Sequence, residues 1–203
     1  MPKPVQFTRE SIINACIEII RTKGSEGLSS RSICRKTGCS VAPLFRTFKN
    51  MEELIANVRI EVDRIFSEYM SGILDYSPAF KEFGMRLVRF AKEDQNLFYM
   101  LFMERRTIGD EWIPKKVQEC LDGIEDSFGI SSEQAEFLFS QMWTYACGLA
   151  ILNMKASKPL TEEEIGYRLS AQFSSQMFFL KAGGNVINVA PHVRAEGEGL
   201  EDI

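Results

Sequence analysis

Apolar residues recur at steps of three and four through most of the chain, which is the spacing of one face of an α-helix. The pattern runs from residue 50 to about residue 76 without a glycine or proline before Gly72, so it predicts one long helix. Residues 97–103 are apolar at seven consecutive positions, which is typical of a short helix that is buried on most sides. Patterns of the β-strand type are confined to a short segment near the C-terminus. The sequence therefore predicts an all-α fold of about nine helices.

Polar residues and glycines mark where several of these helices begin and end. Ser131 and Ser132 are suited to cap one long helix, because a serine at this position accepts a hydrogen bond from the first turn. Thr161 and Glu164 have the spacing of a capping box for the last helix, which Gly183 ends. The helices predicted in this way cover about residues 8–24, 30–36, 41–48, 50–76, 77–92, 97–103, 113–128, 133–154 and 161–182.

Two short helices separated by a glycine are predicted between residues 28 and 50. Gly38 tolerates the positive φ that ends a helix, so it supplies a tight turn. Ser40 is suited to cap the second helix, and because Pro43 has no backbone N–H, we expect the Ser40 hydroxyl to accept from the N–H of Ala42. Such a pair with basic residues on its outside is typical of a helix-turn-helix that reads the DNA major groove.

The chain resembles the TetR (tetracycline-repressor-like) family of bacterial transcription regulators in the segment GLSSRSICRKTGCSVAPLFRTFKNMEEL. The preceding TRESIINACIEIIRTKGSEG is similar to the first helix of that family. The resemblance implies a homodimer that binds a palindromic, double-stranded DNA operator and is released from it by a small ligand. On this basis residues 1–50 are expected to form a DNA-binding domain and residues 51–182 an effector-binding and dimerisation domain. Residues 183–203 are then a tail.

Arg31 is the first choice for a residue that reads a base, because related proteins carry an arginine there that is directed at guanine. An arginine–guanine pair contributes about 1–3 kcal/mol of discrimination. The alternative is that Arg31 contacts phosphate only. Residues at the tip of the second helix offer apolar contacts, such as to thymine methyl groups. The remaining predicted residues are assigned to contacts with phosphate, or with either a base or a phosphate. The complete predicted DNA-binding set is Ser29, Ser30, Arg31, Ser40, Val41, Ala42, Pro43, Phe45, Arg46, Thr47 and Lys49.

Charge is distributed unevenly along the chain. The first 50 residues carry nine Lys or Arg against three Asp or Glu, a net charge of +6. The remaining residues carry 15 basic against 25 acidic side chains, a net charge of −10. A basic N-terminal part and an acidic remainder are typical of a nucleic-acid reader with a second module that does not touch DNA.

The later helices are rich in aromatic residues and methionine, and in related proteins such helices surround a ligand cavity. A cavity walled by these residues has few charges, so the expected effector is a small hydrophobic or aromatic molecule. The alternative is that most of these side chains are ordinary core. The predicted ligand-binding residues are Phe66, Tyr69, Phe98, Phe102, Met103, Trp143 and Cys147.

The last two predicted helices carry more apolar surface than one small domain needs. Paired with a second copy, this hairpin would complete a four-helix bundle, which is also how the resembled family forms dimers. The predicted dimerisation residues are Leu138, Met142, Tyr145, Leu149, Leu152, Ile165, Leu169, Phe173 and Met177.

The five cysteines do not have the spacing of a zinc site, and the single histidine, His192, is far from them in the sequence. Their odd number argues against a framework of disulfides. One interpretation makes Cys34 or Cys39, beside the second short helix, a thiol sensor. The other makes all five small core residues.

Several classes of protein are disfavoured. The chain has no glycine-rich phosphate loop and no Ser/His/Asp or metal-ligand constellation, so we expect neither an enzyme nor a cofactor. Apolar runs fall short of the roughly 18 residues that suggest a membrane span, and the N-terminus lacks the apolar core of a signal peptide, so a cytoplasmic protein is expected.

One alternative function stays open, which is a helical interaction protein with weakened or no specific DNA binding. It rests on Phe45 and Met51, which stand where the resembled family usually has a tyrosine and a lysine that contact the DNA backbone. A true DNA reader should lose affinity steeply as salt rises, so salt dependence distinguishes the two.

Overall fold

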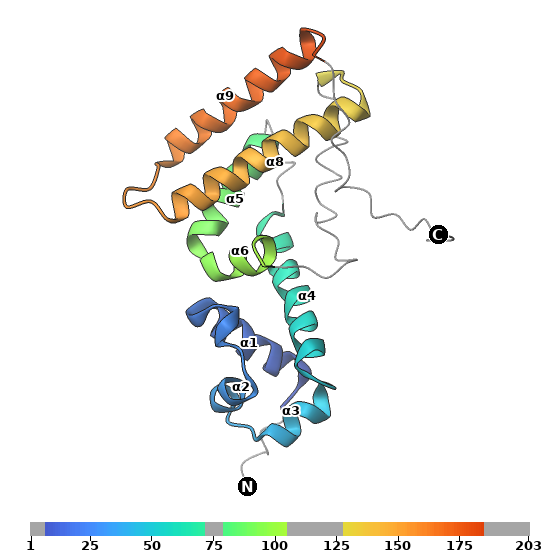
Figure 1. The fold of residues 1–203 in the computed structure, drawn as a ribbon, viewed down its shortest axis with the longest axis vertical. Helices are drawn as coiled ribbons and strands as arrows, with labels where there is room; N and C mark the ends of the chain where they lie inside the picture. Colours follow the sequence, from blue (N-terminus) through green and yellow to red (C-terminus); the bar gives the residue numbers. More distant parts are fainter. Residues whose placement is uncertain (1–6, 72–78, 105–127, 185–203) are drawn as a thin grey trace, which may run out of the picture. The chain divides into compact units, whose positions relative to one another are not determined.

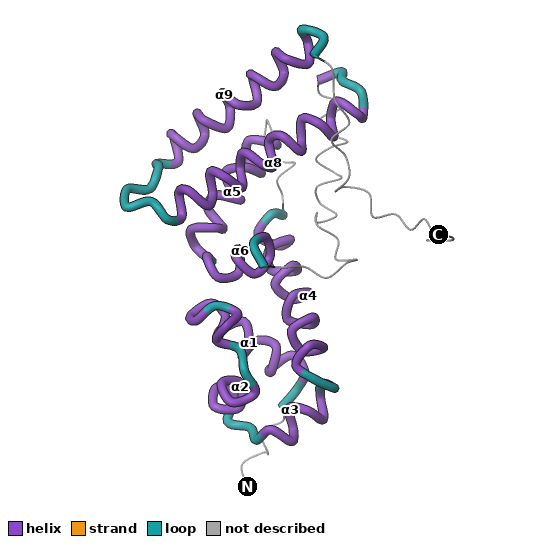
Figure 2. The backbone as a smooth tube through the Cα atoms, viewed as in Figure 1, coloured by secondary structure: helices purple, strands orange, loops and turns teal. Residues whose placement is uncertain are grey.

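The computed structural model describes residues 7–71, 79–104 and 128–184, and every regular element in these ranges is helical (Figure 1 and Figure 2). Eight α-helices and one short 3-10 helix occur there, which confirms the predicted all-α fold. The helix predicted over residues 113–128 lies outside the described residues except at its last position.

The chain forms two compact units that do not follow the predicted boundary at residue 50. Unit 1 comprises Met1–Tyr69 and Arg89–Glu104, and unit 2 comprises Met70–Val88 and Arg105–Ile203. Unit 1 therefore contains the predicted DNA-binding segment together with the long helix that follows it. The functional division at residue 50 stays a prediction.

Helix α1 (Arg9–Lys23) is the central element of unit 1, because it packs against α2, α4 and α6. It begins after Thr8, whose side-chain oxygen accepts a hydrogen bond from the Ser11 N–H at 3.1 Å. It ends at Gly24, where φ is 73°. The other elements of unit 1 are η1 (Ser25–Gly27), α2 (Ser30–Thr37), α3 (Val41–Thr47), α4 (Met51–Tyr69) and α6 (Gln95–Phe102).

The core of unit 1 is formed by one face of each of these helices. Burial of such side chains contributes about 1.5–3 kcal/mol each relative to exposure. In the apolar stripe of α4, Leu54, Val58, Val62 and Phe66 are buried, whereas Ile65 and Tyr69 are half-buried. The core residues that are at most 1 % exposed in this part of the chain include Ile12, Ile20, Ile33, Leu44, Phe48, Leu54, Val58, Val62 and Phe66.

One prediction about these helices is corrected and another is confirmed. Helix α4 ends at Tyr69 rather than near residue 76. The next two residues, which are the last of the described range 7–71, form a turn. Ser71 and Gly72 follow in the sequence, and both residue types favour helix formation less than alanine does. Helix α6 is buried on most sides as predicted, since Leu97, Phe98, Met100 and Leu101 are at most 3 % exposed, whereas Tyr99 is 49 % exposed.

Unit 2 contains the first part of α5 (Ala79–Glu93), α8 (Ser132–Met154) and α9 (Glu162–Lys181). Helices α8 and α9 lie side by side and run in opposite directions (Figure 1). Both predicted N-termini are confirmed, because Ser131 and Thr161 each form a capping box with the residue three positions later.

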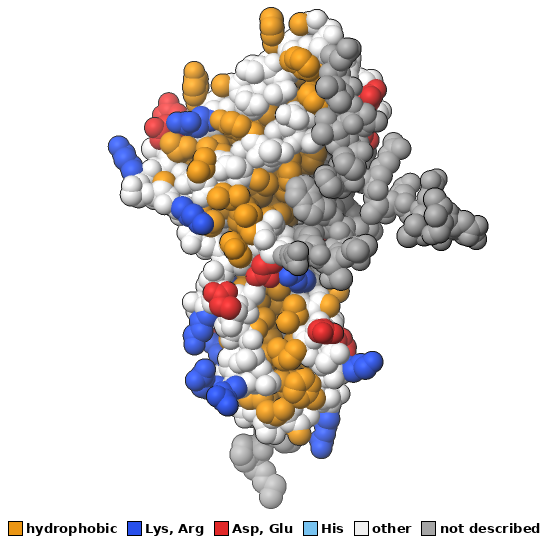
Figure 3. Space-filling model, in the orientation of Figure 1, with side chains coloured by type: hydrophobic (Ala, Val, Ile, Leu, Met, Phe, Trp, Pro, Cys, Tyr) orange, Lys and Arg blue, Asp and Glu red, His pale blue; other side chains and the backbone are white. Residues whose placement is uncertain are grey.

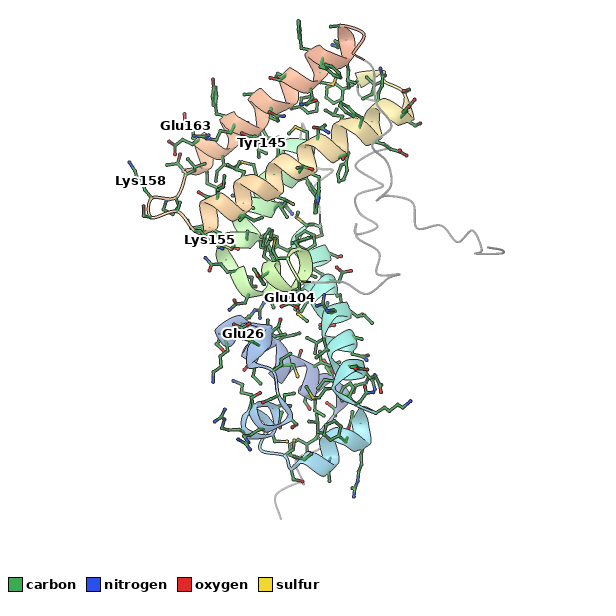
Figure 4. The ribbon with its side chains drawn as sticks, viewed as in Figure 1. Glu26, Glu104, Tyr145, Lys155, Lys158 and Glu163 are labelled. Atoms are coloured by element: carbon green, nitrogen blue, oxygen red, sulfur yellow. The ribbon has the colours of Figure 1, made fainter. Side chains whose placement is uncertain are left out.

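The turn between α8 and α9 is held by a buried amide. Asn153 is 4 % exposed, and its Oδ1 accepts a hydrogen bond from the Leu160 N–H at 2.6 Å. Figure 4 shows Lys155 and Lys158 at this turn, with Glu163 at the start of α9. The bond satisfies a backbone donor beyond the helix end, so it fixes where the chain reverses.

Candidate nucleic-acid interface

The start of α2 is fixed by reciprocal hydrogen bonds between two serines. The Ser29 hydroxyl oxygen accepts from the Ser32 N–H at 3.1 Å, and the Ser32 hydroxyl oxygen accepts from the Ser29 N–H at 2.9 Å. This is a capping box with serine in the place of the usual glutamate. It places Ser30 and the exposed Arg31 in the first turn of α2.

The turn of the helix-turn-helix has the conformation predicted for Gly38. Its φ is 74° and ψ is 9°, which is the left-handed region, and its N–H donates to the Cys34 carbonyl at 2.8 Å. A Cβ added there would meet nothing within 4 Å. The turn therefore needs glycine for its backbone angles and not for lack of space.

The hydrogen bond that was predicted to cap α3 does not form. Ser40 stands at the N-cap with extended backbone, but its side chain makes no capping bond to Ala42 or to any other first-turn N–H. At Thr8, Ser29, Ser131 and Thr161, the capping oxygen accepts from the N–H three residues on. At Ser40 that residue is Pro43, which has no N–H, and the hydroxyl does not move to the neighbouring donor.

Helix α3 presents an outward face that is mostly apolar. Leu44 is fully buried and Phe48, the C-cap, is 1 % exposed, so these two residues face inward as predicted. Val41 and Phe45, four positions apart, are 48 % and 40 % exposed. The other predicted contact residues of this segment are exposed or half-buried, namely Ala42, Pro43, Arg46, Thr47 and Lys49.

Most of the basic side chains near this face are uncompensated, although Lys36 on α2 forms a salt bridge with Glu18 on α1. Residues 27–51 contain five Lys or Arg and no Asp or Glu. Arg31, Arg35 and Arg46 are exposed and form no hydrogen bond or ion pair with any residue that the structure describes. Lys and Arg side chains project from this part of unit 1 in the space-filling view (Figure 3).

Arginines on the supporting helices α1 and α4 are paired instead. Each of them forms a salt bridge with a carboxylate, so their charge is compensated within unit 1. The contrast leaves the positive field concentrated on α2 and α3. The paired residues are Arg9 with Glu53, Arg21 with Asp94, Arg59 with Glu104, and Arg64 with Glu61 and Glu68.

Arg9 holds the C-terminal end of α3 in place. Its Nη1 donates to the Thr47 carbonyl at 3.1 Å, its Nη2 donates to Glu53 Oε1 at 3.0 Å, and its guanidinium carbon lies 4.4 Å from the centre of the Phe48 ring. Glu53 also accepts from the Lys49 N–H at 2.8 Å. These bonds, first that from Lys49 and then that from Arg9, lower the pKa of Glu53.

Arg9 was not among the predicted site residues. It lies 38 positions before Thr47 and 44 before Glu53, so no local spacing connects them. It positions α3 and is not itself placed on the outward face.

The predicted effector residues fall into both units. In unit 1 the rings of Phe66 and Phe102 lie 5.2 Å apart, those of Phe98 and Phe102 lie 4.9 Å apart, and the Tyr69 hydroxyl donates to Glu93 at 2.8 Å. The rings therefore pack against one another. The remaining three are Met103, which is 45 % exposed, and, in unit 2, Trp143 and Cys147. Effector binding at these residues stays a prediction.

Most of the predicted dimerisation residues lie inside unit 2. Six of the nine are at most 8 % exposed in the single chain, so a second chain would meet other residues first. Leu152 is 73 % exposed, and Tyr145, labelled on α8 in Figure 4, and Phe173 are half-buried. The six buried residues are Leu138, Met142, Leu149, Ile165, Leu169 and Met177.

The described ranges contain neither a metal-ligand cluster nor a membrane-spanning helix. No three His, Cys, Asp or Glu side chains come together there as metal ligands would. Within the same residues, no helix has the length and apolar content needed to cross a membrane.

The fold is that of TetR-family transcriptional regulators. A protein of Vibrio parahaemolyticus described as a TetR-family transcriptional regulator is 19 % identical with a TM-score of 0.58, over 82 % of this chain and 97 % of its own. A transcriptional regulator of Rhodococcus sp. Rha1 is 16 % identical with a TM-score of 0.61, over 84 % and 96 %. A Clostridium perfringens protein described as a fatty acid metabolism regulator is 18 % identical with a TM-score of 0.57, over 81 % and 97 %.

The likeness is one of structure and not of sequence. No protein-family model matches the chain, and no curated protein matches it. The structural matches nevertheless extend over more than four fifths of the chain, so they include both compact units and not the helix-turn-helix alone.

Proposed function

We propose that this protein is a transcriptional regulator that binds operator DNA through α2 and α3. The observation that carries the proposal is the distribution of arginines in unit 1, where those on α1 and α4 are paired with carboxylates and those on α2 and α3 are not. Phosphate groups supply the missing partners. The arginines of α2 and α3 have no internal salt bridge to break before they bind phosphate.

The outward residues divide into two roles. Arg31, fixed in the first turn of α2 by the serine capping box, is assigned to a guanine edge, and Arg46 to a base or a phosphate. Val41 and Phe45 form an apolar ridge suited to thymine methyl groups. Ser40, whose hydroxyl is not used as a cap, is assigned to phosphate together with Ser29, Ser30, Thr47 and Lys49.

A salt series with matched variants tests this function. Fluorescence anisotropy is measured against DNA from the regions that flank the gene for the protein, for the wild type, Arg31→Ala and Arg64→Ala. Arg64→Ala removes the same charge from α4, where the side chain pairs with Glu61 and Glu68. We expect Arg31→Ala to weaken binding to one segment about tenfold or more while Arg64→Ala has little effect.

The dependence of DNA affinity on salt concentration distinguishes the two alternative roles of Arg31. If Arg31 reads a base, the variant loses more affinity for the preferred segment than for other DNA. If it contacts phosphate only, affinity falls equally for all segments, and the slope of log affinity against log salt concentration becomes shallower by about one. Binding that has no preferred segment and is insensitive to salt would refute the regulator function. That result would favour the helical interaction protein, for which exposed Val41 and Phe45 offer an apolar contact.

A homodimer is proposed through the exposed residues of α8 and α9. Leu152, Tyr167 and Phe178 are 73 %, 74 % and 77 % exposed, and large apolar residues on packed helices favour burial by a partner. A dimer with two helix-turn-helix segments then reads a palindromic operator. In α8, Gly148 is exposed, and a Cβ there would meet nothing within 4 Å.

Gly148 allows a test of the dimer that spares the fold. Gly148→Arg has room in the single chain but would place a charge on the proposed contact. We expect sedimentation to show a weakened dimer for this variant and an unchanged one for Ser157→Arg, in the turn after α8. A Gly148→Arg protein that stays fully dimeric would refute this surface.

Release of DNA by a small, mostly apolar effector completes the proposal and makes the protein a repressor. A cavity lined by Phe66, Phe98 and Phe102 requires these rings, which pack against one another, to move apart when the effector binds. The effector acts only through its different affinity for the DNA-bound and released states. A thermal-shift series with fatty acids and aromatic acids tests it, and the absence of any stabilisation would count against it.

A further inference from the structure

Two cysteines face each other across the turn of the helix-turn-helix. The Cys39 Sγ lies 3.8 Å from the Cys34 Sγ, and its S–H donates to that sulfur. Cys34 is in the last turns of α2, and Cys39 follows Gly38 and precedes the N-cap of α3. Among the described cysteines, no other pair is in such contact.

The surroundings of the pair hold the two sulfurs together and leave one of them reachable. Cys34 is half-buried, whereas Cys39 is 8 % exposed. The Thr37 Oγ1 lies 2.9 Å from the Cys39 Sγ and fixes that sulfur next to Cys34. A reagent from solvent therefore meets Cys34 first, and Cys39 is in place to react second.

The geometry permits a bond between them. A disulfide needs its sulfur atoms about 2.0 Å apart, so the present separation must shorten by a little under 2 Å. Cys39 lies outside regular helix, next to the left-handed Gly38, so the shift can be absorbed by the turn while α2 keeps its backbone. The other described cysteines lack such a neighbour, and burial raises the pKa of Cys16 and Cys147 to about 12. The pKa of Cys34 is also raised, by burial first and then by its hydrogen bond with Cys39, so the contact between the two sulfurs, and not a low pKa, distinguishes this pair.

We propose that Cys34 and Cys39 are a redox-responsive dithiol that a hydroperoxide converts into a disulfide across the turn. The Cys34 thiolate attacks the peroxide, the O–O bond breaks, an alcohol or water leaves, and Cys34 carries a sulfenic acid. The Cys39 thiol then attacks the Cys34 sulfur, the S–S bond forms and a water leaves. Two thiols are oxidised by two electrons and one peroxide is reduced. A dithiol reductant reverses the bond by exchange.

The bond would act on the DNA-reading surface through its position. Cys39 is one residue before the N-cap Ser40, so drawing it towards α2 displaces the first turn of α3, which carries Val41 and Ala42. The basic side chains are unchanged. Oxidation is therefore expected to remove preference for the operator and to keep the salt-dependent affinity for any DNA. This consequence rests on the function proposed above, whereas the disulfide itself does not.

The bond can be tested on the full-length protein without DNA. Trypsin cleaves after Arg31, Arg35, Lys36 and Arg46, so Cys34 and Cys39 fall in separate peptides, residues 32–35 and 37–46. After hydrogen peroxide treatment and alkylation of free thiols, mass spectrometry should find these two peptides joined. Dithiothreitol should separate them. Cys34→Ala and Cys39→Ala should each abolish the link, and Cys147→Ala should keep it.

Each outcome decides the proposal. The linked peptide in the wild type, lost in both single variants, supports it. Sulfinic or sulfonic acid at Cys34 without the link, or links only between separate chains, overturns it. Anisotropy on the same samples should show operator binding weakened about tenfold or more by oxidation and restored by reduction. A linked protein with unchanged operator binding overturns the effect on DNA. A reduced protein that binds no DNA refutes the proposed function and leaves the peptide result to decide the dithiol.

Discussion

Two glycines with equally open surroundings are expected to respond in opposite ways to the same substitution. A Cβ added at Gly38 or at Gly148 would meet nothing within 4 Å, so crowding does not distinguish them. Gly38 has φ of 74°, whereas Gly148 lies inside α8 with helical backbone. Any difference between Gly38→Ala and Gly148→Ala must therefore come from the backbone.

The expected changes in the free energy of unfolding follow from known backbone preferences. The left-handed conformation costs a residue with a Cβ about 1–2 kcal/mol, and the stiffer unfolded chain returns about 0.4–1 kcal/mol, so Gly38→Ala should destabilise by about 1 kcal/mol. In a helix interior, alanine is more favourable than glycine by about 0.5–1 kcal/mol, so Gly148→Ala should stabilise. Asparagine tolerates the left-handed region, and Gly38→Asn should recover part of the loss.

Urea unfolding followed by circular dichroism measures both variants. The midpoint should decrease for Gly38→Ala and increase for Gly148→Ala, with unchanged dependence on denaturant concentration. A Gly38→Ala protein as stable as the wild type would show that the turn does not need the left-handed conformation. Destabilisation by Gly148→Ala would show that its surroundings are occupied in solution, for example by a second chain.

Two further substitutions test other contacts. Asn153→Ala removes the partner of the Leu160 N–H and leaves a backbone donor unsatisfied at the end of α8, so urea unfolding should show a loss of about 1–3 kcal/mol. The lowered pKa of Glu53 means that its bonds to Lys49 and Arg9 stabilise the folded state above the ordinary glutamate pKa and are lost as pH falls through the lower folded value. The melting temperature of Glu53→Gln should therefore fall less than that of the wild type between pH 6 and pH 3, and parallel curves would contradict this assignment.

Features that depend on a few neighbouring residues were predictable from the sequence. The cap at Ser131, the capping box at Thr161 and the turn at Gly38 use side chains or backbone angles within five positions, and the structure confirms them. The bond of Ser40 is also local, but its prediction assumed that the hydroxyl would choose another donor when Pro43 offered none.

Features that depend on distant residues were not predictable. A helical stripe such as Leu138 and Met142 shows which residues are buried, but it does not show whether the same chain or a second one covers them. Arg9 and Glu53 meet because α1 and α4 pack together, and an exposed arginine in a first helix has no signature of that role. The contact of Cys34 and Cys39 depends on rotamers, which the spacing of five residues leaves undetermined.

Helix α3 has only seven residues and lacks a side-chain cap, so its shape is imposed from outside it. Its end is secured by Arg9 at the Thr47 carbonyl and by the buried Phe48, and neither contact uses a side chain of the outward positions. Exchanges at Val41, Ala42 or Arg46 should leave the folding of unit 1 almost unchanged. The surface that chooses the DNA sequence is thereby free to diversify, and a new operator preference can arise by substitution there without a compensating change elsewhere.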